Sequence, residues 1–165
     1  VLREAGVGQV FHKVNVKPGK PVWFGCGMRD VGCGSPPPHP TSHIPCPLVF
    51  GLPGNPVSTL VCFELFAKTA VRRLLGIDPS GPRPVTAVLT TAFENRGDRP
   101  TYHPARVEAA GDGRLTVATV RWAGSGDLRA TAEANGVAVF EPARSYAAGE
   151  TIRALLWPGA EIAPA

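Results

Sequence analysis

Residues 51–58 read Gly51-Leu52-Pro53-Gly54-Asn55-Pro56-Val57-Ser58. The apolar run before this turn, residues 48–50, is short and flanked by turn residues, which predicts a buried strand. After the turn, apolar residues recur with helical spacing over residues 57–75, and two arginines followed by Gly76 predict the helix end. The first half of the chain is therefore predicted to contain a strand, a tight turn and a long helix.

The turn itself is a candidate anion site. Asn55 is predicted to be the N-cap of the helix, and Pro56 suits the first helical position because its missing N–H costs nothing there. An open helix N-terminus after a glycine-containing turn presents backbone N–H groups that favour phosphate or another oxyanion. The alternative is a tight connection without a ligand, because glycine-rich turns are common.

Upstream of this turn, three lysines gather within residues 13–20, although the whole chain has only four. The alternation over residues 10–17 predicts a strand on which His12 packs with the valines. Lys13 and Lys17 share the other face of that strand, ~13 Å apart at the usual rise per residue. Lys20 follows at a Pro-Gly turn. This clustering predicts a cationic site for a polyanion, and the alternative is a solvated lysine face.

These two motifs together resemble one known family. Lys17-Pro18-Gly19-Lys20-Pro21 followed by residues 51–58 is similar to the molybdopterin molybdenumtransferases, which include the bacterial molybdenum-insertion enzyme and the carboxy-terminal domain of gephyrin. The resemblance covers residues 2–27 and 48–76 and, more weakly, 84–157. It implies part of a three-layer α/β molybdopterin-binding domain over residues 1–77, followed by a small β-barrel-like domain over residues 83–160.

The resemblance also implies a reaction, the last step of molybdenum cofactor assembly. Family members bind adenylylated molybdopterin, cleave the adenylate and place molybdate on the dithiolene, with a divalent cation such as Mg²⁺. Lys13 and Lys17 match the family's two functional strand lysines, and we interpret them as groups that stabilise charge on the leaving phosphate. The family's metal-binding and catalytic aspartates have no match in this chain.

The same resemblance gives the expected substrate-binding residues. A family arginine falls on Pro104, and Arg106 is expected to replace it because an offset of two residues keeps the same face of a strand. Ser125, within a Gly-Ser-Gly loop, matches a family serine. The expected set is Lys20, Pro53, Gly54, Asn55, Pro56, Ser58, Arg106 and Ser125.

Residues 1–6 look like the end of a helix, which predicts that the chain is part of a longer gene product. Without the upstream carboxylates, independent catalysis is not expected, and the full-length form is expected to be a homodimer, as in the family. The alternative function is a non-catalytic molybdopterin-binding or scaffold module. A third alternative is a gene fragment that does not fold stably, because strand edges would be left unpaired.

Residues 27–47 are rich in proline and glycine and predict an irregular insertion. Two readings of its polar side chains are open. One is a zinc site, and the other, which we favour, is a surface loop with incidental thiols, because no Cys-x-x-Cys pair is present. The residues concerned are Cys26, Cys33, His39, His43 and Cys46. Cys62, on the predicted helix, is expected to be a small core residue.

Composition and the second half complete the prediction. The 165 residues are 44% hydrophobic with a net charge of +4, and no basic run supports nucleic-acid binding. No apolar stretch is long enough to span a membrane and no signal peptide is visible, so a cytoplasmic location is expected. After a linker at residues 76–84, short strands are predicted at residues 85–93, 101–109, 115–122, 137–141 and 151–157, which favours a small barrel or sandwich.

Overall fold

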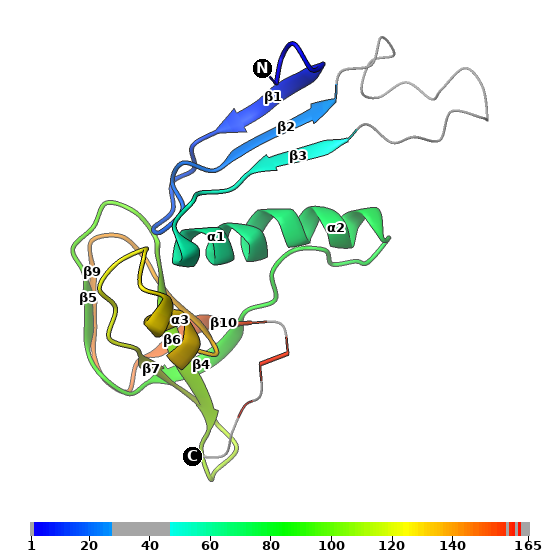
Figure 1. The fold of residues 1–165 in the computed structure, drawn as a ribbon. Coiled ribbons are helices and arrows are strands. Elements are labelled where there is room, and N and C mark those ends of the chain that lie inside the picture. The colour runs from blue at the N-terminus through cyan, green and yellow to red at the C-terminus, as the bar shows by residue number, and fades with distance from the viewer. Residues whose placement is uncertain (1, 28–46, 158, 161, 163–165) are drawn as a thin grey trace.

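The computed structural model describes residues 2–27, 47–157, 159–160 and 162. The chain forms two units that lie against each other (Figure 1). The first is a three-stranded sheet with one long helix beneath it, and the second is a five-stranded barrel. The predicted class, an α/β unit followed by a small barrel-like β unit, is confirmed.

The sheet of the first unit is antiparallel, in the order β1-β2-β3. Its strands are β1 (Val7–His12), β2 (Trp23–Gly27) and β3 (Leu48–Gly51). The helix crosses one face of this sheet and runs without a break through α1 (Pro56–Cys62), the π-helical turn η1 (Phe63–Ala67) and α2 (Lys68–Leu74). Phenylalanine rings 4.6–6.0 Å apart fill the space between the two layers, namely Phe11, Phe24, Phe50 and Phe66.

Both predicted ends of the long helix are confirmed. Asn55 is the N-cap in an extended conformation, and Pro56 is the first helical residue. At the other end Gly76 has φ +71°, and the N–H of Ile77 donates to the carbonyl of Arg72 at 3.0 Å. A glycine in the left-handed region with this hydrogen bond is the common way to close a helix.

Another prediction for the first unit was wrong. Residues 48–50 form the expected strand, but it is an edge strand of the described sheet and Leu48 is 37% exposed, so it is not buried. Residues 2–6 are a turn with the geometry of the predicted helix end, because Gly6 has φ +72°, its N–H donates to the carbonyl of Arg3, and the N–H of Val7 donates to that of Leu2.

The predicted strand over residues 10–17 is also wrong. β1 ends at His12, because Lys13 has φ +69° and a left-handed residue cannot continue a strand. A bulge between Gln9 and Phe11 disturbs the alternation on which the prediction rested. As a result His12 is exposed rather than packed with the valines.

The second unit is a closed barrel in the strand order β10-β4-β7-β6-β8. All neighbours are antiparallel except β4 and β7, which are parallel. Small residues alternate with larger ones inside it, and Phe140 and Leu89 are the largest fully buried side chains. The strands are β4 (Val85–Leu89), β6 (Thr101–Ala109), β7 (Leu115–Thr119), β8 (Gly136–Phe140) and β10 (Thr151–Leu156).

All five predicted strands of the second half are present, as is the irregular linker before them. The pattern missed three short elements: α3 (Leu128–Glu133) and the pair β5 (Phe93–Asn95) and β9 (Arg144–Tyr146). They have three to six residues each, too few for a periodic apolar signal.

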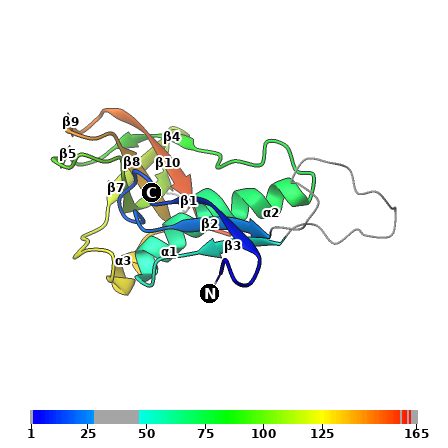
Figure 2. The same cartoon turned by 90° about the horizontal axis from the view of Figure 1, so that it is seen from above.

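The two units meet at the helix. Val61 and Leu65 on the helix pack against Val137, Leu155 and Trp157 of the barrel unit. Figure 2 shows α3 beside the start of α1, which places the loop before α3 next to the turn at residues 51–58. Among the described residues no helix combines the length and apolar character needed to cross a membrane.

Candidate functional site

A pocket of about 430 Å³ opens where the two units meet the start of α1. Such a volume suits a small-molecule ligand. Both units contribute to its wall, and we call it the Lys17 pocket. Its lining residues are Lys17, Pro18, Gly19, Lys20, Pro21, Pro53, Asn55, Ser58, Arg99, Trp122, Gly124 and Ser125.

Lys17 is held in place by its own backbone. Its N–H donates to the carbonyl of Pro100 at 2.9 Å, and its carbonyl accepts from the N–H of Tyr102 at 2.7 Å. These two bonds attach Lys17 to the start of β6, in parallel register with Thr101. The segment around Lys17 therefore belongs to the barrel's edge as much as to the first unit, and this fixes its position at the pocket.

The start of the helix is closed rather than open, which corrects the picture of a free helix N-terminus. The N–H of Val57 donates to the carbonyl of Ser125 at 3.1 Å, and the side-chain amide of Asn55 donates to the hydroxyl of Ser125 at 2.9 Å. Asn55 makes no side-chain cap of its own helix. One of the backbone N–H groups that was expected to bind an oxyanion is thus hydrogen-bonded to the loop of the second unit instead.

Asp127 holds the Ser125 loop in shape. Its carboxylate accepts from the N–H of Ala123 at 3.0 Å, which closes the loop. It also accepts from the N–H of Ala130 at 3.1 Å, which caps the N-terminus of α3. The N–H of Ala123, followed by that of Ala130, lowers the pKa of this carboxyl below its usual value. Asp127 is therefore ionised at neutral pH and keeps Ser125 at the helix start.

The charge of the Lys17 pocket is positive. Lys17, Lys20 and Arg99 line it, and among the described lining residues there is no acidic side chain. Arg99 is oriented by a 3.1 Å hydrogen bond from Nη1 to the carbonyl of Val16. The indole N–H of Trp122 is buried and has no hydrogen-bond partner among the described residues, so the wall also carries an unused donor. This combination of donors and cations favours a ligand with several negative charges.

His103 lies behind the wall of the pocket. Its ring packs edge-on against Trp122, with 5.0 Å between the ring centroids, and Nδ1 is 2.9 Å from the carbonyl of Pro104. Burial lowers the pKa of His103 below its usual value, the Pro104 carbonyl opposes that shift, and the charge of Lys17 lowers the pKa further. The imidazole is therefore neutral in the folded protein at neutral pH.

We expect this histidine to make the stability depend on pH. The unfolded chain keeps the ordinary His pKa of about 6.5, so it binds a proton more readily than the folded protein. The contribution of neutral His103 is complete above about pH 6.5 and is lost as the pH falls toward the lower folded-state pKa. Thermal unfolding at about pH 7.5 and pH 5.5 should show a smaller drop in Tm for His103→Gln than for the native chain. An equal drop in both proteins would contradict this.

The structure brings together six of the residues that the sequence singled out. Lys17, Lys20, Pro53, Asn55, Ser58 and Ser125 all line the pocket. Gly54 and Pro56 belong to the same turn but do not line the pocket. Lys13, an exposed residue directly after β1, does not line it either. Arg106 does not line the pocket either, because its guanidinium pairs with Glu108 at 2.9 Å on the barrel surface.

Two lining residues were missed by the sequence analysis. Arg99 precedes β6 in a turn with other charged residues, and Trp122 follows β7. Neither lies in a motif, and Arg99 comes near the lysines through the pairing of Lys17 with Thr101 and through its own hydrogen bond to the carbonyl of Val16. Arg99, and not Arg106, lines the pocket together with Lys17.

Metal-binding side chains do not cluster in the described part of the chain. Within residues 2–27 and 47–157, no three His, Cys, Asp or Glu side chains lie close enough together to hold a metal ion. Of the candidate zinc ligands only Cys26 is described, and residues 28–46 of the predicted insertion lie outside the described residues. Cys62 is fully buried, as expected of a core residue.

Comparison with known proteins identifies both units. Residues 1–73 match the model of the probable molybdopterin binding domain, and residues 86–157 match that of the MoeA C-terminal region (domain IV). Together these matches account for most of the chain, one unit each.

Curated relatives agree with both matches. The molybdopterin molybdenumtransferase of Haemophilus influenzae is 30% identical over 149 residues, which are 88% of this chain and 33% of that protein. The Synechocystis enzyme of the same name is 26% identical over 95% of this chain and 34% of its own length. Gephyrin of Dictyostelium discoideum is 36% identical over 104 residues, 59% of this chain and 14% of that protein. The chain thus spans about a third or less of these relatives.

Solved structures show the same fold. The molybdopterin biosynthesis moeA protein of Pyrococcus horikoshii OT3 superposes with a TM-score of 0.65 at 24% identity, over 92% of this chain and 33% of that one. A molybdenum cofactor biosynthesis protein of Pyrococcus furiosus superposes with a TM-score of 0.63 at 25% identity, over 92% of this chain and 46% of that one.

Proposed function

Because the chain belongs, as a partial chain, to the molybdopterin molybdenumtransferase family, we propose that it binds adenylylated molybdopterin in the Lys17 pocket and acts in the insertion of molybdenum. The observation that carries this proposal is the pocket itself. Its wall combines residues of both family domains, and its charged groups are all cations. Molybdopterin phosphates and molybdate are anions, so the pocket and the ligand are complementary in charge.

The residues have distinct roles in this proposal. Lys17 and Lys20 bind the phosphate oxygens and stabilise the charge that develops on the leaving phosphate when the adenylate is cleaved. Ser125 and Asn55 tie the second unit to the helix start and form the polar side of the pocket. Lys13 remains a proposed catalytic residue from the resemblance alone. The described part of the chain thus supplies binding and electrostatic stabilisation.

The remaining points of the proposal come from the resemblance. A homodimer, a cytoplasmic location and Mg²⁺ are expected for the full-length form. No step of the reaction is assigned to Mg²⁺ here, because no cluster of three or more metal-binding side chains is found among the described residues. A non-catalytic molybdopterin-binding module would use the same pocket, and molybdate-dependent formation of active cofactor separates the two functions.

The proposal predicts which arginine binds the ligand. Arg99→Gln should weaken molybdopterin binding about fivefold to tenfold, because it removes one charged donor from the pocket wall. Arg99→Lys, which keeps the charge, should recover part of that loss. Arg106→Gln should leave the affinity unchanged, because this side chain pairs with Glu108 outside the pocket. Anaerobic calorimetry measures all three. A loss with Arg106→Gln and none with Arg99→Gln would reverse the assignment.

A further inference from the structure

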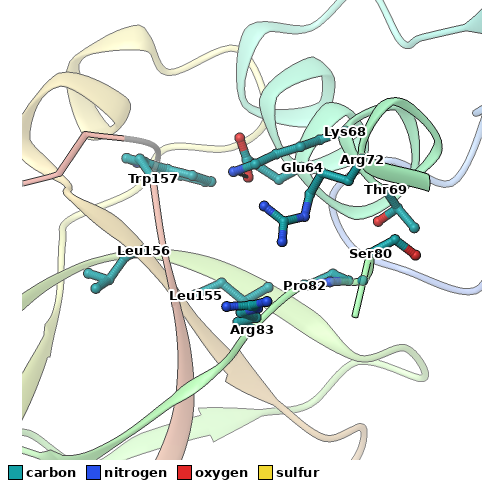
Figure 3. A pocket seen from close by; sticks show the side chains of 11 residues that line it. Glu64, Lys68, Thr69, Arg72, Ser80, Pro82, Arg83, Leu155, Leu156 and Trp157 are labelled. Atoms are coloured by element: carbon teal, nitrogen blue, oxygen red, sulfur yellow. Dashed lines mark hydrogen bonds and ion pairs between the residues drawn. The ribbon is translucent and has the colours of Figure 1, made fainter. Parts of the chain in front are cut away.

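A second cavity, of about 190 Å³, lies further along the helix, between α2, the linker and the end of β10 (Figure 3). We call it the Glu64 cavity. It shares no lining residue with the Lys17 pocket, so it is a separate site. It is lined by Glu64, Lys68, Thr69, Arg72, Ser80, Gly81, Pro82, Arg83, Leu155, Leu156 and Trp157.

Among the described residues, only one of the two carboxylate oxygens of Glu64 has a polar partner. Its side chain is 10% exposed, and one oxygen, Oε2, lies 2.7 Å from Nζ of Lys68. The other oxygen, Oε1, is buried and accepts no hydrogen bond from any residue that the structure describes. A buried acceptor without a partner is costly, and in native proteins such a group usually meets a ligand or an ordered water.

Two buried donors around the same cavity are also unused. Within the described part of the chain, Nε of Arg72 and Nε1 of Trp157 have no hydrogen-bond partner. The guanidinium of Arg72 is held at its end by a 3.2 Å bond from Nη2 to the carbonyl of Pro79, and it points into the cavity between Glu64 and Arg83 (Figure 3). One acceptor and two donors therefore surround a single small space.

The charge of the cavity selects an anion. Lys68, Arg72 and Arg83 are positive and Glu64 is negative, so two positive charges are left in excess. The second carboxylate oxygen of Glu64, Oε1, restricts which anions can bind. It repels an anion whose oxygens carry no proton, and it accepts a hydrogen bond from an anion that carries an O–H.

We propose that the Glu64 cavity binds hydrogen phosphate. Arg72, Lys68 and the indole N–H of Trp157 donate to the charged oxygens, and Glu64 accepts the O–H of the anion. A rotation of the carboxylate about its terminal torsion, which is broad in glutamate, turns Oε1 toward the ligand. Sulfate and molybdate have no O–H at neutral pH, so the same carboxylate excludes them.

Calorimetric titration of the chain with sodium phosphate and with sodium sulfate, at equal ionic strength and about pH 7.5, tests this proposal. Both titrations use the Lys17→Gln/Lys20→Gln background, which weakens anion binding in the Lys17 pocket and keeps the two sites distinguishable. Phosphate is expected to bind at least about tenfold more tightly than sulfate. Equal affinities, or no binding of phosphate at millimolar concentration, would overturn the proposal.

Two variants test the roles of the side chains. Glu64→Gln should weaken the binding of phosphate and strengthen the binding of sulfate, so that the preference for phosphate over sulfate falls below about threefold. Trp157→Phe keeps an aromatic ring and removes the indole N–H donor, so the affinity of the cavity for both anions should fall. Arg96→Gln, which removes an exposed charge far from the cavity wall, is the matched control and should change neither. Circular dichroism and thermal unfolding establish that each variant is folded. An unchanged preference in Glu64→Gln would contradict the role of its carboxylate, and if that variant does not fold, Trp157→Phe and the ester titration below decide.

Free phosphate and a phosphate ester are distinguished by pH. An ester loses its last phosphate proton near about pH 6, whereas inorganic phosphate keeps one at pH 7.5. Methyl phosphate, which has no O–H other than that of its phosphate group, is therefore expected to bind at about pH 5.5 and not at pH 7.5, and inorganic phosphate at both. Equal binding of methyl phosphate at the two pH values would show that the phosphate O–H is not recognised, and it would refute the proposal.

Discussion

Gly19→Ala is expected to lower the free energy of unfolding by about 3 kcal/mol, a large part of the stability of a small protein. Gly19 has φ +117°, a conformation that residues with a side chain rarely adopt. A Cβ at this position would lie 2.4 Å from Sγ of Cys62, far inside van der Waals contact. The loop that carries Lys17 and Lys20 would have to move away from the helix.

Cys62 gives this prediction a second test. Its thiol is buried and lies 3.4 Å from the carbonyl of Gly19, and burial raises its pKa to about 11, so it is a neutral donor at neutral pH. In a Cys62→Ala background the clash is gone and only the backbone strain remains. Gly19→Ala should then cost about 1–2 kcal/mol, measured by urea unfolding of the four proteins of the cycle. An equal cost in both backgrounds would show that the contact with Sγ does not matter.

The long helix and the barrel strands were predictable because their signals are local. The apolar spacing after Pro56, the arginines before Gly76 and the alternation in residues 101–109 each act within one element. The parallel pairing of β4 with β7 closes the barrel through residues far apart in the sequence, and no local pattern encodes it.

The site could be predicted only in part, for a similar reason. The residues from the Lys17-Pro18-Gly19-Lys20 motif and from the turn at residues 51–58 meet as expected. Lys13 does not join them, because its positive φ ends the strand on which the shared face was predicted. Arg99 joins them through contacts between the two units, namely the backbone bonds of Lys17 to the start of β6 and the hydrogen bond of Arg99 to the carbonyl of Val16. Ser125 was expected at the site, but its carbonyl also accepts from the N–H of Val57, so this N–H of the helix start is not open to an anion.

We therefore expect Lys17 and Lys20 to contribute more to anion binding than the helix start does. Lys17→Gln and Lys20→Gln should each weaken molybdopterin binding about tenfold, and the double variant by somewhat less than the product of the two effects. The loss should shrink as salt is added, since both side chains are exposed and their charges are screened. Asn55→Ala removes the 2.9 Å bond to Ser125 without changing the charge, so its smaller loss should not depend on salt.

The most direct test is the dissociation constant of molybdopterin for the native chain and for Lys17→Gln, measured by anaerobic calorimetry at low salt. Arg114→Gln is the matched control, because it removes an equal charge from the exposed β6–β7 turn, where Arg114 pairs only with Asp112 among the described residues. A loss of about tenfold in Lys17→Gln with no loss in Arg114→Gln is the expected result. Equal affinities in all three folded proteins would mean that the ligand does not bind in the Lys17 pocket.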